Sequence, residues 1–145
     1  MDLDKLINEI KVLNEIPNLN RGGCGYSAIA IYRYIKQNYR YKSIKLVVLN
    51  DYESDHDNTI RFVDTKGRLG ELYASHIVVK LNNSIHIDSK GLYSVNRHNY
   101  GIELNKSEHK ILYLALKRFQ WNPDFDRRNV NKVLSLTNPL QLTLF

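Results

Sequence analysis

The sequence predicts an α+β fold with an antiparallel sheet. Two segments with helical periodicity come first, strand-like segments occupy the middle of the chain, and one further helical segment follows. The strand-like segments follow one another through short turns with no helix between them, which favours antiparallel pairing.

The central helix is expected from about residue 25 to 38, because its apolar residues surround much of its circumference. An earlier helix over residues 2–14 carries apolar residues at spacings of three and four, and Pro17 ends it. The remaining expected elements are strands at 43–49, 60–63 and within 72–87, and a helix at 107–119 with Ser107 as its N-cap.

Length and composition indicate one folded domain with a tail. The chain has 145 residues, of which 43% are hydrophobic and 25% charged, values typical of globular proteins. We expect an α+β domain over residues 1–120 and a C-terminal extension over 121–145, where proline and asparagine mix with charge. No segment approaches the roughly 18 apolar residues of a membrane span, so a soluble, cytoplasmic protein without membrane association is expected.

The net charge of +6 favours weak, nonspecific attraction to nucleic acid. The basic residues are dispersed along the chain rather than gathered in one tract, which favours an ordinary solvated surface over a dedicated binding stripe. No cofactor is expected. Acidic residues alternate over 51–57, but this segment lacks the glycine and the final glutamate of a calcium loop, so we expect an exposed loop and no metal.

The single cysteine, Cys24, lies between glycines in the segment GGCGYS, at the expected start of the central helix. One cysteine cannot form an internal disulfide, so the thiol is either a small buried residue or a reactive group. Unpaired amides and the positive end of the helix dipole favour a thiolate at this position.

The segment SHIVVKLNNSIHID predicts a hairpin in which apolar and polar residues alternate. Placing both apolar rows on one face favours a loop of three or five residues centred on Asn82, with Ile77 opposite Ile87 and His76 opposite Asp88. A carboxylate beside His76 would fix the orientation of the imidazole. His86 lies on the same face and is the competing candidate for the base.

The segments GGCGYSAIAIYRYI and SHIVVKLNNSIHID together resemble the papain-like superfamily of thiol enzymes, in which a cysteine on a helix precedes a histidine and an acid on neighbouring strands. The resemblance implies that Cys24 is the nucleophile, His76 the base and acid, and Asp88 the orienting carboxylate. It also implies an amide side chain before the cysteine that helps to bind the oxyanion, for which Asn18 and Asn20 are the candidates. The RGGC segment is also similar to the arylamine N-acetyltransferases, longer chains with the same triad.

The chain ends in QLTLF, which resembles the pentapeptide by which bacterial proteins bind the sliding clamp of DNA polymerase. The resemblance implies that Gln141, Leu142, Leu144 and Phe145 contact this partner, as a short peptide with hydrophobic anchors. The alternative is a final strand that packs against the protein's own sheet, because leucines alternate over part of the segment.

Three functions follow from these patterns. The first is a cysteine-dependent hydrolase, a peptidase, amidase or deamidase acting on a peptide or protein and recruited to DNA replication by its tail. The second is an acyltransferase with the same triad. The third is a clamp-binding replication modulator of bacterial or phage origin without catalytic activity, in which the same residues are structural.

Overall fold

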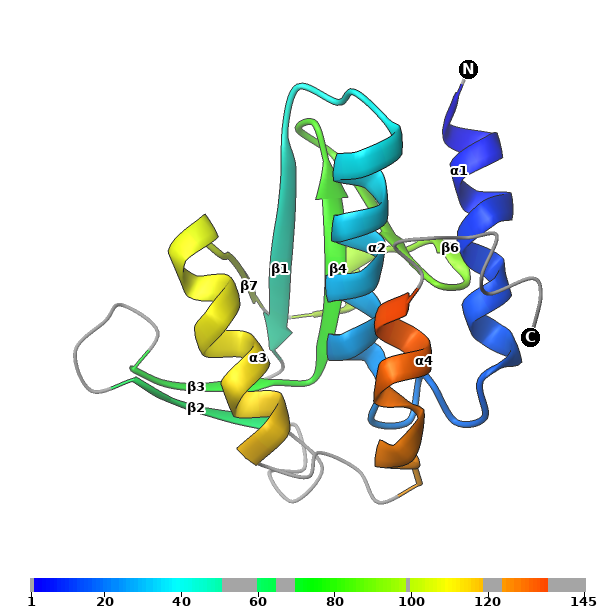
Figure 1. Cartoon of the computed structure of the whole chain (residues 1–145). Helices are drawn as coiled ribbons and strands as arrows, with labels where there is room; N and C mark the ends of the chain where they lie inside the picture. The colour runs from blue at the N-terminus through cyan, green and yellow to red at the C-terminus, as the bar shows by residue number, and fades with distance from the viewer. Residues whose placement is uncertain (1, 51–59, 65–69, 99, 119–123, 136–145) are drawn as a thin grey trace.

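The structure, a computed structural model, describes residues 2–50, 60–64, 70–98, 100–118 and 124–135 and has the predicted α+β class (Figure 1). Its main sheet is antiparallel, with strand order β6-β5-β4-β1-β7. These strands are β1 (Ile44–Asn50), β4 (His76–Leu81), β5 (Ile85–Asp88), β6 (Gly91–Leu92) and β7 (Tyr100–Glu103). A separate antiparallel pair is formed by β2 (Ile60–Asp64) and β3 (Gly70–Ala74).

Helix α2 packs on one face of the main sheet, α3 and α4 pack against α2 on the same side, and α3 also contacts β2 (Figure 1). The central helix α2 spans Cys24–Asn38, as predicted, and contacts β4, β1, α3 and α4. The other helices are α1 (Asp2–Ile10), α3 (His109–Arg118) and α4 (Val130–Leu134), and the short 3₁₀ segments are η1 (Lys11–Glu15), η3 (Val95–Arg97), η4 (Lys106–Glu108) and η5 (Arg127–Asn129).

The sheet has apolar side chains on both faces. On the helical side, Ile31 and Ile35 of α2 and Ile77 of β4 belong to the main core and are at most 1% exposed. Alternation along the strands sends Val78 to the opposite face, where a smaller cluster includes Tyr93. Tyr93, on the loop after β6, therefore packs on apolar side chains of the sheet, and it forms part of the site described below.

Two predicted helix ends differ from those observed. The first helix is α-helical only to Ile10 and continues as the 3₁₀ segment η1 to Glu15, a tightening common at helix ends. Ser107 is not the N-cap of the third helical segment. The N-cap is Asn105, which precedes η4 and forms a capping box with Glu108. Glu108 Oε1 accepts from Asn105 N at 2.7 Å and so satisfies the backbone donor of the N-cap residue.

The predicted hairpin forms with a different register. Val79 lies opposite Ile87 and Leu81 opposite Ile85, so the three-residue loop is centred on Asn83 rather than Asn82. The predicted pairing of Ile77 with Ile87 was therefore wrong by two residues. Because side chains alternate with a period of two, this shift leaves the apolar row on the same face.

The described part of the C-terminal segment, residues 124–135, packs on the main core. Phe125 is 3% exposed and Val133 is fully buried, and α4 contacts α2. Val130 and Leu134 also pack against this core, so these residues contact the domain that was expected to end at residue 120. Residues 121–123 and 136–145 lie outside the described residues.

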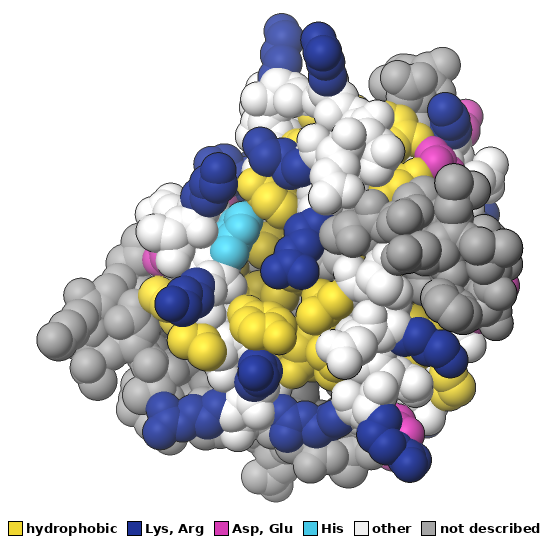
Figure 2. All heavy atoms as spheres, viewed as in Figure 1, with side chains coloured by type: hydrophobic (Ala, Val, Ile, Leu, Met, Phe, Trp, Pro, Cys, Tyr) yellow, Lys and Arg dark blue, Asp and Glu magenta, His cyan; other side chains and the backbone are white. Residues whose placement is uncertain are grey.

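The helical face carries many basic side chains. Figure 2 shows Lys and Arg distributed around hydrophobic side chains on this face rather than gathered at one point. Within the described parts of the chain, no helix is both long and apolar enough to cross a membrane.

Candidate active site at the start of the central helix

The backbone before Cys24 requires glycine. A Cβ at Gly23 would lie 2.7 Å from the carbonyl oxygen of Leu19 and 2.8 Å from the ring of Phe125, closer than packed atoms approach one another. Gly23 is therefore the residue that lets the chain enter α2 beneath these groups, and Cys24 becomes the first residue of the helix. Cys24 is 4% exposed, and its position gives the sulfur the positive end of the helix dipole.

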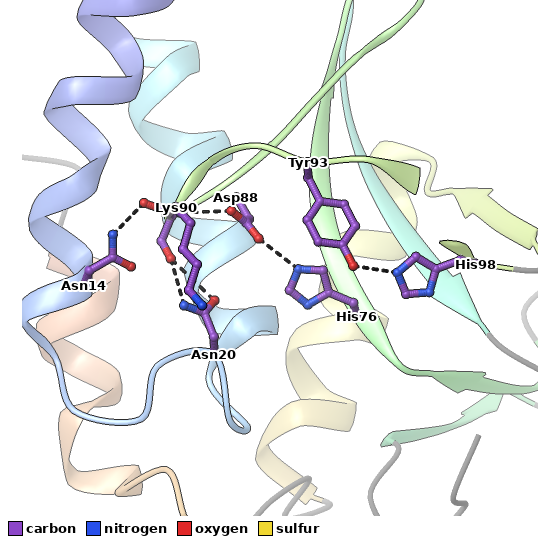
Figure 3. Close-up of polar contacts among 8 residues, drawn as sticks. Asn14, Asn20, His76, Asp88, Lys90, Tyr93 and His98 are labelled. Atoms are coloured by element: carbon purple, nitrogen blue, oxygen red, sulfur yellow. Dashed lines mark hydrogen bonds and ion pairs between the residues drawn. The ribbon is translucent and has the colours of Figure 1, made fainter. Parts of the chain in front are cut away.

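The His76 imidazole and the Asp88 carboxylate are in direct contact. His76 Nε2 donates to Asp88 Oδ2 at 3.1 Å, and the two side chains are 12% and 10% exposed. Asp88 Oδ1 accepts from the backbone N of Lys90 at 2.9 Å, so both carboxylate oxygens have a donor (Figure 3). This arrangement fixes the ring of His76 and the tautomer that carries a proton on Nε2.

The predicted contact between His76 and Asp88 is present although the predicted hairpin register was wrong. Continuing the observed pairing by one residue places Asp88 opposite Val78, so His76 is a diagonal rather than a direct neighbour of Asp88. Diagonal residues share a face of the sheet, and the longer imidazole spans the greater separation.

The Cys24 thiol is close enough to the imidazole of His76 to change its pKa. Burial lowers the pKa of His76, but the charge of Cys24, a hydrogen bond with Asp88 and a hydrogen bond with Cys24 together raise it to about 9. Because Nε2 is bonded to Asp88, Nδ1 is the ring nitrogen left for the sulfur. The helix N-terminus and two neighbouring strands thus bring Cys24, His76 and Asp88 together, at the end of the molecule where α2 and β4 begin (Figure 1).

The two candidate oxyanion amides lie in different places. Asn20 lines the cleft beside His76 and exchanges hydrogen bonds with Ser89 Oγ at 3.3 and 3.4 Å. Asn18 adopts a positive φ of 58° and donates from Nδ2 to the carbonyl oxygen of Asp124 at 2.9 Å. The side-chain amide of Asn18 is thus hydrogen-bonded to the backbone of residue 124. Of the two candidate oxyanion amides, Asn20 is the one that lines the cleft.

A cleft of about 540 Å³ opens beside the imidazole. Its described lining residues are Asn20, Ser75, His76, Asp88, Lys90, Leu92, Tyr93 and His98. Ser75, Tyr93 and His98 were not anticipated from the sequence, because they fall on turns and a loop without periodicity.

The unanticipated residues form a hydrogen-bond chain against His76. The ring centroids of Tyr93 and His76 are 4.6 Å apart, and Tyr93 Oη is hydrogen-bonded to His98 Nε2 at 2.6 Å (Figure 3). His98 Nδ1 lies 3.4 Å from Ser75 Oγ, which donates to the carbonyl oxygen of Leu49 at 3.1 Å. Tyr93 is thereby fixed as one wall of the cleft against the imidazole.

His86, the competing base, lies in a different hollow. It is opposite Lys80 in the hairpin, and both residues line a second cavity that also contains Glu103. Burial and the charge of Lys80 lower the pKa of His86. Of the two candidate bases, His76 is the one that lines the cleft and is hydrogen-bonded to Asp88.

The remaining predicted sites have no structural counterpart to describe. Among the described residues, no three His, Cys, Asp or Glu side chains are grouped so that they could bind a metal ion. The acidic segment 51–57 and the tail residues Gln141, Leu142, Leu144 and Phe145 lie outside the described residues.

Comparison with known proteins adds no family assignment: no protein-family model, no curated protein and no solved structure matches this chain. The functional argument therefore depends on the chemistry of the site. The site combines a thiol, an imidazole and a carboxylate near a cleft. Such a set can move a proton between the sulfur and a bound substrate.

Proposed function

We propose that the protein is a papain-like thiol hydrolase that cleaves an amide or ester bond through Cys24, His76 and Asp88. The observation that carries the proposal is the His76 imidazole, which is hydrogen-bonded to the Asp88 carboxylate and whose pKa is raised by Cys24. The order of the three residues along the chain, and their placement on a helix and two neighbouring strands, supports the same class.

In the first half of the reaction, the Cys24 thiolate attacks the carbonyl carbon of the substrate. The carbonyl oxygen becomes an oxyanion, which accepts from the backbone N of Cys24 and from Asn20 Nδ2 after that amide leaves Ser89. The His76 imidazolium gives its proton to the leaving nitrogen or oxygen as the bond to carbon breaks. The products are the leaving group and a thioester on Cys24.

In the second half, neutral His76 takes a proton from water and the resulting hydroxide attacks the thioester. The C–S bond breaks, the carboxylic acid leaves, and Cys24 and His76 return to their starting state. Deamidation follows the same steps with ammonia as the leaving group, and acyl transfer replaces water by another nucleophile. Asp88 holds the charged imidazole in place throughout.

A burst experiment with p-nitrophenyl acetate tests the proposal. Acylation of Cys24 by this ester releases p-nitrophenolate, so we expect a burst equal to the enzyme concentration before slower turnover. Cys24→Ala and His76→Gln should abolish the burst while leaving the circular dichroism spectrum unchanged. The chain has one cysteine, so an acetyl mass that is present in the wild type and absent in Cys24→Ala assigns the thioester.

His86→Gln is the matched control, since it removes the same group from the neighbouring strand and outside the cleft. It should retain the full burst. An unchanged burst in Cys24→Ala, or the absence of a burst in the folded wild type, would contradict the assignment. Equal losses in His86→Gln and His76→Gln would contradict the role of His76.

A further inference from the structure

We infer that the cleft selects substrates that carry a carboxylate, and that Lys90 is the residue that recognises it. This inference concerns the substrate class of the same cleft and therefore rests on the function proposed above. It is carried by the turn between β5 and β6, which presents one exposed cation beside the imidazole.

The turn is held rigidly by its neighbours. Ser89 is fully buried, its carbonyl oxygen accepts from Asn14 Nδ2 at 2.8 Å, and its hydroxyl exchanges hydrogen bonds with Asn20. The backbone N of Lys90 donates to Asp88 Oδ1, and Gly91 adopts a φ of 117° that allows the tight return into β6. The backbone of Lys90 is thus fixed by the same carboxylate that orients His76.

Lys90 is the exposed residue in this otherwise buried turn. Asp88, Ser89 and Gly91 are buried, whereas Lys90 is exposed and lines the cleft. Figure 3 shows its side chain extending from the turn on the side of Asn20, the candidate oxyanion amide. Among the described residues no carboxylate pairs with its ammonium group, so the charge remains available to a ligand.

The charges around the cleft favour an anion. Of the described residues that line it, only Asp88 is acidic, and both of its oxygens already accept hydrogen bonds. The charge of the His76 imidazolium is paired with the Asp88 carboxylate and with Cys24, which leaves Lys90 as the cation at the cleft without an acidic partner among the described residues. A substrate carboxylate is therefore attracted by Lys90, and a cationic substrate is repelled by it.

Two alkylating reagents of equal size test this inference on Cys24 itself. Iodoacetate and iodoacetamide both transfer a methylene carbon to the thiolate and release iodide, but only iodoacetate carries a carboxylate. The ratio of their rates, relative to the same ratio for a free cysteine derivative, measures selection for the anion. We expect an elevated ratio in the wild type, and a fall of about two- to fivefold in Lys90→Gln, the range for one exposed ion pair.

Lys36→Gln is the matched control. It removes the same charge from the last turn of α2, about 18 Å along the helix from Cys24, and should leave the ratio unchanged. A Lys90→Gln ratio equal to that of the wild type would overturn the inference. That result differs from failure of the proposed function, in which iodoacetamide itself would react with Cys24 no faster than with a free thiol.

The position of the carboxylate is resolved by protection of Cys24 against iodoacetamide. Nα-acetylglutamate α-amide carries its carboxylate on the side chain, and its isomer Nα-acetylglutamine carries it at the terminus. Protection by the first that depends on Lys90 identifies an acidic side chain, and protection by the second identifies a peptide C-terminus. Equal protection by both acids and by neutral Nα-acetylglutamine amide would contradict selection for a carboxylate.

Discussion

Replacing Asp88 by asparagine tests how the carboxylate controls the imidazole. Asparagine keeps Oδ1 as the acceptor for Lys90 N, so the turn is expected to stay intact. In place of Oδ2 it offers an NH₂ group, which cannot accept from His76 Nε2. The imidazole must then place its proton on Nδ1, facing the sulfur, which is the wrong tautomer for taking a proton from the thiol.

The size of the effect follows from the lost hydrogen bond. A hydrogen bond to a charged group contributes about 2 kcal/mol, and one pKa unit corresponds to about 1.4 kcal/mol. The pKa of His76, about 9 in the wild type, should therefore fall by more than one unit. At pH 8 the imidazolium fraction would drop from roughly nine-tenths to about a quarter for a fall of about 1.5 units.

The assay is the rate of Cys24 alkylation by iodoacetate between pH 5 and 10. The wild-type rate should decline near pH 9 as the imidazolium that attracts the anion is lost, and in Asp88→Asn this decline should move below pH 8. Asp126→Asn is the control, because its carboxylate binds Arg128 at an exposed 3₁₀ segment. A decline that stays near pH 9 in Asp88→Asn would refute the role given to the carboxylate.

Three further results are expected. The raised pKa of His76 contributes stability that is complete below pH 6.5 and lost as the pH rises through about 9. In urea titrations the free energy of unfolding of the wild type should therefore exceed that of His76→Gln by an amount that shrinks by up to about 3 kcal/mol across this range. A difference that stays constant with pH would contradict this expectation. Gly23→Ala should lower the free energy of unfolding by about 1–3 kcal/mol and slow alkylation of the thiol, because its Cβ overlaps Leu19 and Phe125; wild-type stability would show that the segment relaxes without cost. Deleting residues 141–145 should abolish binding to a bacterial sliding clamp in surface plasmon resonance without changing the unfolding midpoint, and a lower midpoint would instead favour the packed-strand alternative.

The elements with strong periodicity were predictable. Helix α2 and strand β1 were expected almost to the residue, since each carries a dense run of apolar residues: α2 is buried around much of its circumference, and the last five residues of β1 are buried. Helix α4 was missed. It has five residues, and its core contact comes mainly from Val133, a pattern too short for a periodicity argument.

The contact between His76 and Asp88 was predictable from the sequence, and its geometry was less so. Alternation placed His76 and Asp88 on one face of the hairpin, which is what their contact requires, although the exact register was wrong by two residues. Whether Asn18 or Asn20 lies at the cleft depends on the path of the chain before α2. That path is set by contacts with residues more than 60 positions away, Asp124 and Ser89.

Local chemistry in the sequence determined the α+β class, the position of Cys24 at a helix start and the common face of His76 and Asp88. These features follow from interactions between residues close in the chain. The tertiary structure decided what surrounds the imidazole: the Cys24 thiol, which raises its pKa, the Tyr93 ring packed against it, and Lys90, exposed on a buried turn in the same cleft. Such contacts join segments separated by up to about 70 residues, and they depend on how whole elements pack.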